Sequence, residues 1–401
     1  MSPEINPVVF QKNWPSTSGF GGAERATMRF TEAISQSEQI AILTCGEYYR
    51  GKEKSVDYQP PDHIFSENKL TIHEIPSVSQ IVDLVLKNRS EVGVFQIGWG
   101  FEHYPDDFSR ILDTNLPLVL RICETEQYKQ LVQELPEVQK KGFLEKMVSR
   151  VDSLVAISTP LVNEAVETGF DPKRVHLIYS SVDTDIFKPV SSEDKKITRG
   201  MLKLPKEERI FLFVGRAVQA KGIDTLIGAW NKLPEDFKDK NHMVIVGAST
   251  QNDPAYDLFK STVSSGDRSM SFPGVITDEK EVAKYYQASD VFLYPSLHNE
   301  GLSVSILEAM SSGLPVITTE WIATKTGAKD LVKPDKTGIV FDQNSGQEGL
   351  SKVIANIDWD HVSSLGKMAR KHVLSLGVDN KIAAEKYINL YTELLSSGIN
   401  K

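Results

Sequence analysis

Two glutamates eight residues apart flank the start of an expected helix in the last third of the chain. Glu300 lies in a short loop after the apolar run Val291–Tyr294, and Glu308 lies inside the helix that follows. A carboxylate accepts hydrogen bonds from two hydroxyls, so the pair could hold sugar hydroxyls. The amides of residues 301–304 are the orphan donors of a helix start, which suits an anion. Taken alone, the pair is better explained as one glutamate that complements the helix dipole and a second that is exposed on the helix.

Two cations follow another apolar run, Phe211–Val214. Gly215 ends this run, Arg216 follows it, and Lys221 comes five residues later, just before a helix expected at Ile223–Asn231. A planar guanidinium fork and a compact ammonium together suit a diphosphate. They could also be two solvated cations beside a turn. Combined with the glutamate loop of the same expected sheet, they predict a diphosphate site that does not require a divalent metal.

Apolar runs alternate with helical periods along most of the chain, which predicts parallel sheets covered on both faces by helices. We expect an α/β fold of two Rossmann-like, doubly wound domains that face each other across a cleft, with ligands at the carboxyl ends of the strands. The expected strands of the first domain are Pro7–Phe10, Ile40–Leu43, Leu70–Glu74, Gly93–Ile97, Leu118–Ile122, Ser153–Ile157 and Val175–Ile178. Those of the second are Ile210–Val214, Met243–Val246, Ser271–Phe272, Val291–Tyr294, Pro315–Thr318 and Gly338–Phe341.

The domain boundaries follow from composition. A chain of 401 residues favours two cores. We expect a first domain at 1–188, a linker at 189–208, where apolar residues are scarce, and a second domain at 209–376. The helix expected at Asp379–Ser396, within segment 377–401, either caps the second domain or crosses back onto the first.

Charge and composition exclude several partners. The formal net charge is −9, and residues 1–190 hold 19 basic and 27 acidic side chains. This acidity argues against nucleic acid and disfavours an anionic membrane surface. No apolar run of about 18 residues and no signal-peptide pattern occurs, and Cys45 and Cys123 are expected to be buried thiols. We therefore expect a cytoplasmic protein.

One basic stretch, Lys129–Arg150, interleaves lysines with apolar residues at helical spacing. We favour a surface helix whose lysine stems cover apolar surface over peripheral contact with a membrane.

The motifs together resemble the retaining glycosyltransferases of family 4, which have the GT-B fold and a Glu-x7-Glu motif. Residues Pro295–Val316 match Pro-Ser-x-x-x-Glu-Gly-(x)6-Glu-Ala-Met-(x)2-Gly-x-Pro-Val, and Val214–Gly222 match Val-Gly-Arg-(x)4-Lys-Gly. Segments 21–25, 180–189 and 327–338 look like further motifs of that family. The resemblance covers nearly the whole chain and is strongest in the second half.

The resemblance implies a hexosyltransferase of carbohydrate biosynthesis that uses a nucleotide-diphosphate sugar, retains the anomeric configuration and needs no metal or other cofactor. It implies Arg216, Lys221 and Glu300 as catalytic residues, with Glu308 on the nucleotide ribose and Glu300 on the transferred sugar. The donor-binding residues it implies are Gly22, Gly215, Arg216, Lys221, Val275, Glu300, Gly301, Leu302, Ser303 and Glu308. The nucleotide stays open, as does the acceptor, which could be a glycan, lipid, small molecule or protein.

Three departures from the family pattern concern the first domain and the glutamate loop. Cys123-Glu124 stands where the family often has His-Asp, Ser303 replaces a glycine, and Ser180-Ser181 replaces Asn-Gly. Candidate acceptor-side residues are His103, Cys123 and Glu124. The first departure keeps open a non-catalytic, nucleotide-sugar-binding subunit of a glycosyltransferase complex, and a nucleotide-sugar hydrolase or epimerase is a further alternative.

Overall fold

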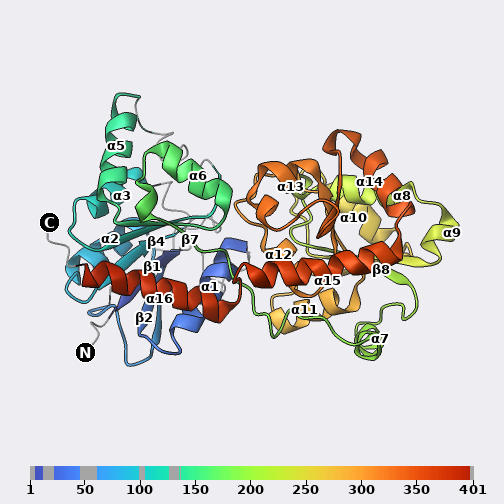
Figure 1. The fold of residues 1–401 in the computed structure, drawn as a ribbon, viewed down its shortest axis with the longest axis horizontal. Helices are drawn as coiled ribbons and strands as arrows, with labels where there is room; N and C mark the ends of the chain where they lie inside the picture. Colours follow the sequence, from blue (N-terminus) through green and yellow to red (C-terminus); the bar gives the residue numbers. More distant parts are fainter. Residues whose placement is uncertain are drawn as a thin grey trace. The chain divides into compact units, whose positions relative to one another are not determined.

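Two compact units make up the structure, a computed structural model that describes residues 5–11, 22–45, 61–98, 104–125, 135 and 137–397. One unit comprises Met1–Ser181 with Asp379–Lys401, and the other comprises Val182–Val378. Each holds a parallel β-sheet with helices packed on it (Figure 1). This confirms the predicted fold class of two Rossmann-like domains. The cleft between them stays a prediction.

The first unit has a seven-stranded sheet in the order β3-β2-β1-β4-β5-β6-β7. Its central strands are buried on both faces, so their sequences are mostly apolar without a polar residue at every second position. The strands are β1 Pro7–Gln11, β2 Ile40–Thr44, β3 Leu70–Glu74, β4 Val94–Ile97, β5 Leu118–Ile122, β6 Ser153–Ala156 and β7 Val175–Leu177. The helices are α1 Gly22–Ile34, α2 Val78–Lys87, α3 Pro105–Leu112, α5 Glu137–Arg150, α6 Thr159–Thr168 and α16 Asn380–Ser396, with a 3₁₀ turn, η2, at Pro172–Arg174.

Helix α16 belongs to this first unit and packs against α1 (Figure 1). The Tyr387 ring stacks on Phe30 with ring centroids 4.3 Å apart. The Tyr387 hydroxyl accepts a 3.0 Å hydrogen bond from Nε of the buried Arg121 of β5. The Tyr391 hydroxyl donates to Gln96 Oε1 at 2.7 Å. The C-terminal helix therefore completes the core of the first unit.

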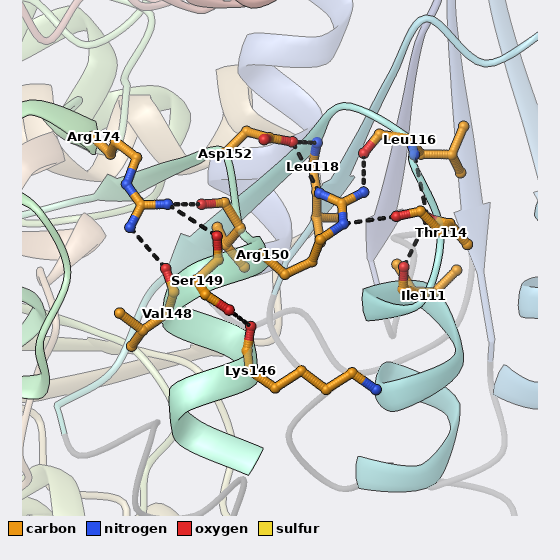
Figure 2. Close-up of polar contacts among 11 residues, drawn as sticks. Ile111, Thr114, Leu116, Leu118, Lys146, Val148, Ser149, Arg150, Asp152 and Arg174 are labelled. Carbon is orange, nitrogen blue, oxygen red and sulfur yellow. Dashed lines mark hydrogen bonds and ion pairs between the residues drawn. The ribbon is translucent and has the colours of Figure 1, made fainter. Parts of the chain in front are cut away.

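The end of α5 is fixed by two arginines (Figure 2). Arg174 donates to the carbonyl oxygens of Val148 and Val151 at 2.8 and 2.9 Å, which satisfies acceptors that a helix end leaves open. Arg150 Nε donates to Thr114 O at 2.7 Å, and Lys146 Nζ lies 2.7 Å from an Asp113 carboxylate oxygen. Two cations of the basic stretch thus serve contacts within the unit, which favours the surface-helix interpretation for the described part, α5.

The second unit has a six-stranded sheet in the order β10-β9-β8-β11-β12-β13. Its strands are β8 Arg209–Val214, β9 Asn241–Val246, β10 Met270–Gly274, β11 Val291–Tyr294, β12 Val316–Thr319 and β13 Gly338–Phe341. Helices α8 Ile223–Asn231, α10 Tyr256–Ser264 and α14 Gly346–Ala355 pack as one group. Helices α7 Ser192–Met201, α11 Glu279–Ala288, α12 Val304–Ser311 and α15 Trp359–Ser375 pack as another (Figure 1). Shorter turns of helix are α9 Glu235–Lys238, α13 Glu320–Lys325, η3 Gln219–Lys221, η4 Gly327–Asp330 and η5 Gln343–Ser345.

The segment predicted as a linker, 189–208, lies inside the second unit and contains α7. Ser191 caps this helix by accepting from the Asp194 amide at 3.1 Å. Arg199 is buried and donates to Ala288 O at 2.8 Å and to an Asp290 carboxylate oxygen at 2.7 Å. Hydrogen bonds and an ion pair hold α7 against the unit. The helix therefore does not need the apolar stripe that would have marked it in the sequence.

Within the described residues, no helix combines the length and the apolar character that crossing a membrane requires.

Candidate functional site

The predicted diphosphate site lies at the carboxyl ends of two neighbouring strands of the second unit. Strand β8 pairs with β9 on one side and with β11 on the other. The chain leaves β8 toward β9 and returns later to β11, so the two strands form the topological switch point of a doubly wound sheet. Ligands of such sheets bind at this point, outside the carboxyl ends of the strands.

The loops after β8 and β11 are fastened to each other. Gly222 has φ +73°, and a Cβ at this position would lie 2.2 Å from Pro295 O, so only glycine fits. Ser296 Oγ and the Leu297 amide both donate to Ala220 O, at 3.1 and 3.4 Å. The backbone therefore positions Lys221, which lies between Ala220 and Gly222, beside the glutamate loop.

Lys221 and Glu300 form an ion pair that Tyr294 completes. The Lys221 ammonium contacts Glu300 Oε1 and donates to the Tyr294 hydroxyl at 3.2 Å. The Tyr294 hydroxyl donates to the same Glu300 oxygen at 2.7 Å. The Lys221 and Glu300 side chains are only 14% and 12% exposed. Three polar groups from two strand ends thus meet in a largely buried cluster.

The cluster changes the acidity of all three groups. Burial alone raises the pKa of Glu300, but the Lys221 charge and hydrogen bonds from Lys221 and Tyr294 outweigh it and hold the pKa below its usual value. Burial alone lowers the pKa of Lys221, yet Tyr294 and Glu300 raise the net pKa above its ordinary value. Burial and the Glu300 charge raise the pKa of Tyr294 to about 12. At neutral pH the cluster therefore holds one cation, one anion and a neutral phenol.

Arg216 follows directly on Gly215, whose φ is +156°. Its side chain is exposed, and within the described residues no hydrogen bond or ion pair engages its guanidinium. Gly247, the residue after β9, approaches Gly215 so closely that a Cβ there would lie 1.8 Å from Gly215 O. The backbone after β8 is therefore tightly packed, and the Arg216 guanidinium that follows it is exposed.

Helix α12 begins at the glutamate loop and is buried along its whole length. Ser303 is the N-cap residue, and Gly301, Leu302 and Ser303 are all buried. For the amides of residues 301–305, the described part of the chain provides no backbone acceptor. The first turn of α12 therefore keeps the donors that an anion could use.

Glu308 lies inside α12 with no exposed surface. Its Oε2 accepts a 2.9 Å hydrogen bond from the hydroxyl of Tyr286 in α11, which is itself fully buried. A ligand hydroxyl can reach this carboxylate only if neighbouring residues move.

The remaining predicted residues are dispersed. Val275 follows β10 and is 69% exposed, and Gly22 is the first residue of α1. Cys123 follows β5, is 5% exposed, and its Sγ accepts a 2.9 Å hydrogen bond from Arg121 Nη1, with Glu124 next to it. Cys45 is likewise a buried thiol outside any disulfide, as predicted for both cysteines. His103 lies outside the described residues.

Sequence reasoning missed Tyr294 and Tyr286. Tyr294 ends an apolar strand, and Tyr286 lies in a helix with many charged residues, so neither stands in a motif that marks a ligand site. The signal for Tyr294 was its place as the last residue of a strand before Pro295, where its hydroxyl can reach the ligand end of the sheet.

Part of the chain is similar in sequence to known glycosyltransferases. Residues 194–372 match the family model for glycosyl transferases group 1. An uncharacterized glycosyltransferase, MJ1069, of Methanocaldococcus jannaschii is 26% identical over 62% of this chain and 60% of that relative. A D-inositol 3-phosphate glycosyltransferase of Xylanimonas cellulosilytica is 31% identical over 52% of this chain and 49% of that relative. This chain thus aligns with about half to three fifths of the length of these relatives.

A solved structure extends the likeness to the whole fold. The crystal structure of Anabaena Alr3699/HepE in complex with UDP superimposes with a TM-score of 0.72 at 15% identity, covering 98% of this chain and 100% of that one. By sequence, residues 194–372 of this chain match the group 1 glycosyl transferases, and by fold the chain is of the GT-B class.

Proposed function

We propose that this chain is a glycosyltransferase that moves a sugar from a nucleotide-diphosphate sugar to an acceptor, with retention of the anomeric configuration and without a divalent metal. The observation that carries the proposal is the meeting of Lys221, Tyr294 and Glu300 at the switch point, beside the exposed Arg216 and the first turn of α12. The group 1 family match and the likeness to a structure with UDP support it.

In the proposed reaction, the bond between the anomeric carbon and the leaving diphosphate oxygen breaks. The acceptor oxygen bonds to that carbon on the same face, and its proton passes to an oxygen of the leaving phosphate. Negative charge builds on the diphosphate, and Arg216, Lys221 and the amides of the α12 start are placed to stabilise it. Lys221 and the α12 amides are held in place before the reaction, so little reorganisation of these donors opposes it.

Lys221 can serve the diphosphate without leaving its partners. An ammonium carries three donors, and Tyr294 and Glu300 occupy two of them. The third would remain for a phosphate oxygen, while Glu300 keeps lone pairs for a hydroxyl of the transferred sugar. The pair would thus orient both groups of the donor at once.

Glu308 is proposed to accept from the nucleotide ribose, and Val275 and Gly22 to contact the base and the diphosphate. Since Glu308 is fully buried, its role requires the residues around it to open on donor binding. Loss of the Tyr286 hydrogen bond on donor binding would accompany that opening.

The experiment is a product analysis with UDP-, GDP- and ADP-glucose and a panel of glycan, lipid and small-molecule acceptors. NMR of the product gives the anomeric configuration, and a parallel series in EDTA tests metal independence. An α-linked product from an α-donor, formed equally in EDTA, is expected. The UDP bound in the HepE structure makes UDP-glucose the first donor to test.

Each other outcome contradicts a named part of the proposal. A β-linked product contradicts retention, and loss of transfer in EDTA contradicts metal independence. Release of free sugar alone indicates a hydrolase, an altered nucleotide-sugar indicates an epimerase, and nucleotide binding without turnover indicates a non-catalytic subunit. In the Lys221→Ala variant, transfer should fall by about a hundredfold or more, because a preorganised charge donor is lost.

A further inference from the structure

A pocket of about 590 Å³ lies within the second unit at the amino ends of its central strands. Its lining includes Arg209, the first residue of β8, together with Asp290 and Pro315, which directly precede β11 and β12. Since all strands of this sheet are parallel, this edge is opposite the one that holds Lys221 and Glu300. The pocket is therefore separate from the proposed donor site, and its volume is typical of small-molecule sites.

The base of the pocket is apolar. Tyr286, Leu314 and Val362 line it and are each at most 5% exposed. The Trp359 ring also lines it, with the Arg209 guanidinium 4.7 Å above the ring centroid. A ligand with an organic part would find apolar contact here.

The lining is strongly cationic. It contains one carboxylate, Asp290, and five basic side chains: Lys195, Arg209, Lys367, Arg370 and Lys371. Asp290 is already paired, at 3.0 Å with Lys195 and at 2.7 Å with Arg199, which lies outside the lining. The other four cations form no ion pair with any described residue.

Two of these cations face a mutual repulsion. Lys367 and Lys371 are four residues apart on α15, so their ammonium groups lie on the same side of the helix and destabilise it. Arg370 lies between them in sequence and donates through Nη1 to Phe187 O and Ser311 O. These hydrogen bonds hold its guanidinium in position at the pocket. An anion in the pocket would relieve the repulsion and find a fixed guanidinium.

A buried hydroxyl in the pocket wall lacks a partner. Ser312, at the end of α12, is 4% exposed, and no described residue forms a hydrogen bond with its Oγ. Leaving such a buried hydroxyl without a partner is unfavourable, and an oxyanion that reached it would accept its hydrogen bond.

We propose that this pocket binds a small, soluble phosphate ester. Lys367, Lys371, Arg370 and the Ser312 hydroxyl hold the phosphate, and the apolar base with Trp359 holds the organic part. A pocket of about 590 Å³ suits a small molecule better than the flat face of a membrane. Residues 191–401 as a whole carry nearly balanced charge, so the cations are a local feature. The proposal does not depend on the proposed transferase activity.

The test is isothermal titration of phenyl phosphate into the full chain. The wild type should bind phenyl phosphate, and the pocket variant decides whether that binding occurs at this edge of the sheet. In Lys367→Ala/Lys371→Ala the Kd should rise about tenfold or more, because two charged hydrogen-bond donors are lost. Lys367, Lys371, Lys280 and Lys352 are all exposed, and circular dichroism verifies the fold of each variant.

The matched control is Lys280→Ala/Lys352→Ala, which removes two exposed lysines of the same unit outside the pocket and should leave the Kd unchanged. A second variant, Ser312→Ala, should weaken binding with little change of surface charge. Absence of binding by the wild type, or equal binding by the wild type and the pocket variant, would each overturn the proposal. So would binding to phosphatidylglycerol vesicles that disappears in the pocket variant, since that result assigns the cations to a membrane.

Discussion

Replacing Lys221 with methionine would remove one charge from a buried pair and leave the other in place. Glu300 would keep the Tyr294 hydrogen bond but lose its cation. Desolvation, which Lys221 now outweighs, would then dominate and raise the pKa of Glu300. At neutral pH the folded variant must either hold an unpaired buried carboxylate or protonate it. Either state lowers the free energy of unfolding.

The magnitude follows from the burial of the pair. Breaking a buried ion pair from one side costs about 3–5 kcal/mol, and the small remaining exposure of both side chains places the cost toward the lower value. A domain of this size loses roughly 2–4 °C in Tm per kcal/mol. We therefore expect the Tm of the second unit to fall by on the order of 10 °C at pH 7.

The pH dependence has a definite sign. The folded pKa of Glu300 is depressed, so its contribution is present above the unfolded value of 4.5 and is lost as the pH falls through the folded pKa. The folded pKa of Lys221 is raised, so its contribution is full below 10.5 and is lost only at higher pH, as the pH rises through the folded pKa. The difference between wild type and Lys221→Met should therefore be largest between about pH 5 and 10 and shrink in acid.

The assay is differential scanning calorimetry from pH 4 to 8, with Lys196→Met as the matched control. Lys196 pairs with Glu207 at 2.8 Å, but both side chains are well exposed, so its loss should leave the Tm unchanged. The double variant Lys221→Met/Glu300→Gln should recover most of the lost stability. An unchanged Tm in Lys221→Met, or a loss that persists equally at pH 4, would refute the reasoning.

Two further predictions concern the loop and the C-terminal helix. Gly222→Ala should destabilise the second unit by about 1–2 kcal/mol or more, since the positive φ of Gly222 and its contact with Pro295 O leave no room for a Cβ. The control Gly142→Ala in α5 meets open space and should be neutral or stabilising by up to about 1 kcal/mol. Equal Tm values for the two variants by calorimetry would contradict this prediction. Tyr387→Phe should destabilise the first unit by about 1–3 kcal/mol because the buried Arg121 loses an acceptor, and an unchanged urea midpoint by near-UV circular dichroism would contradict this.

The sheets were predictable because their strands are buried on both faces. Strands β5 and β11 have the predicted bounds, since a continuous apolar run records two-sided burial directly. Helix α7 was missed because its anchor, Arg199, is a charged residue that becomes buried only through partners far away in sequence. Helices α14 and α15 were also not predicted, although Asp358 caps the start of α15.

The sequence predicted the location of the candidate site, at one edge of the sheet. It did not predict the contacts between the residues of the site. Strand order brings Lys221 and Glu300 to the same edge, and this follows from the pattern of elements alone. That they form an ion pair through Tyr294 depends on the close approach of the Gly222 and Pro295 backbones, which no local pattern encodes. The burial of Glu308 beneath the loop is likewise a tertiary property.

The most direct test of the central claim is the affinity of the chain for UDP, GDP and ADP, measured by thermal shift and titration. A nucleotide that binds at the switch point should raise the free energy of unfolding by roughly 2.7 kcal/mol at 100 times its Kd. We predict that at least one of the three binds the wild type, that Arg216→Ala and Lys221→Ala each weaken it by about tenfold or more, and that Lys280→Ala does not. Binding that is equally tight in Arg216→Ala, Lys221→Ala and the wild type would contradict the account.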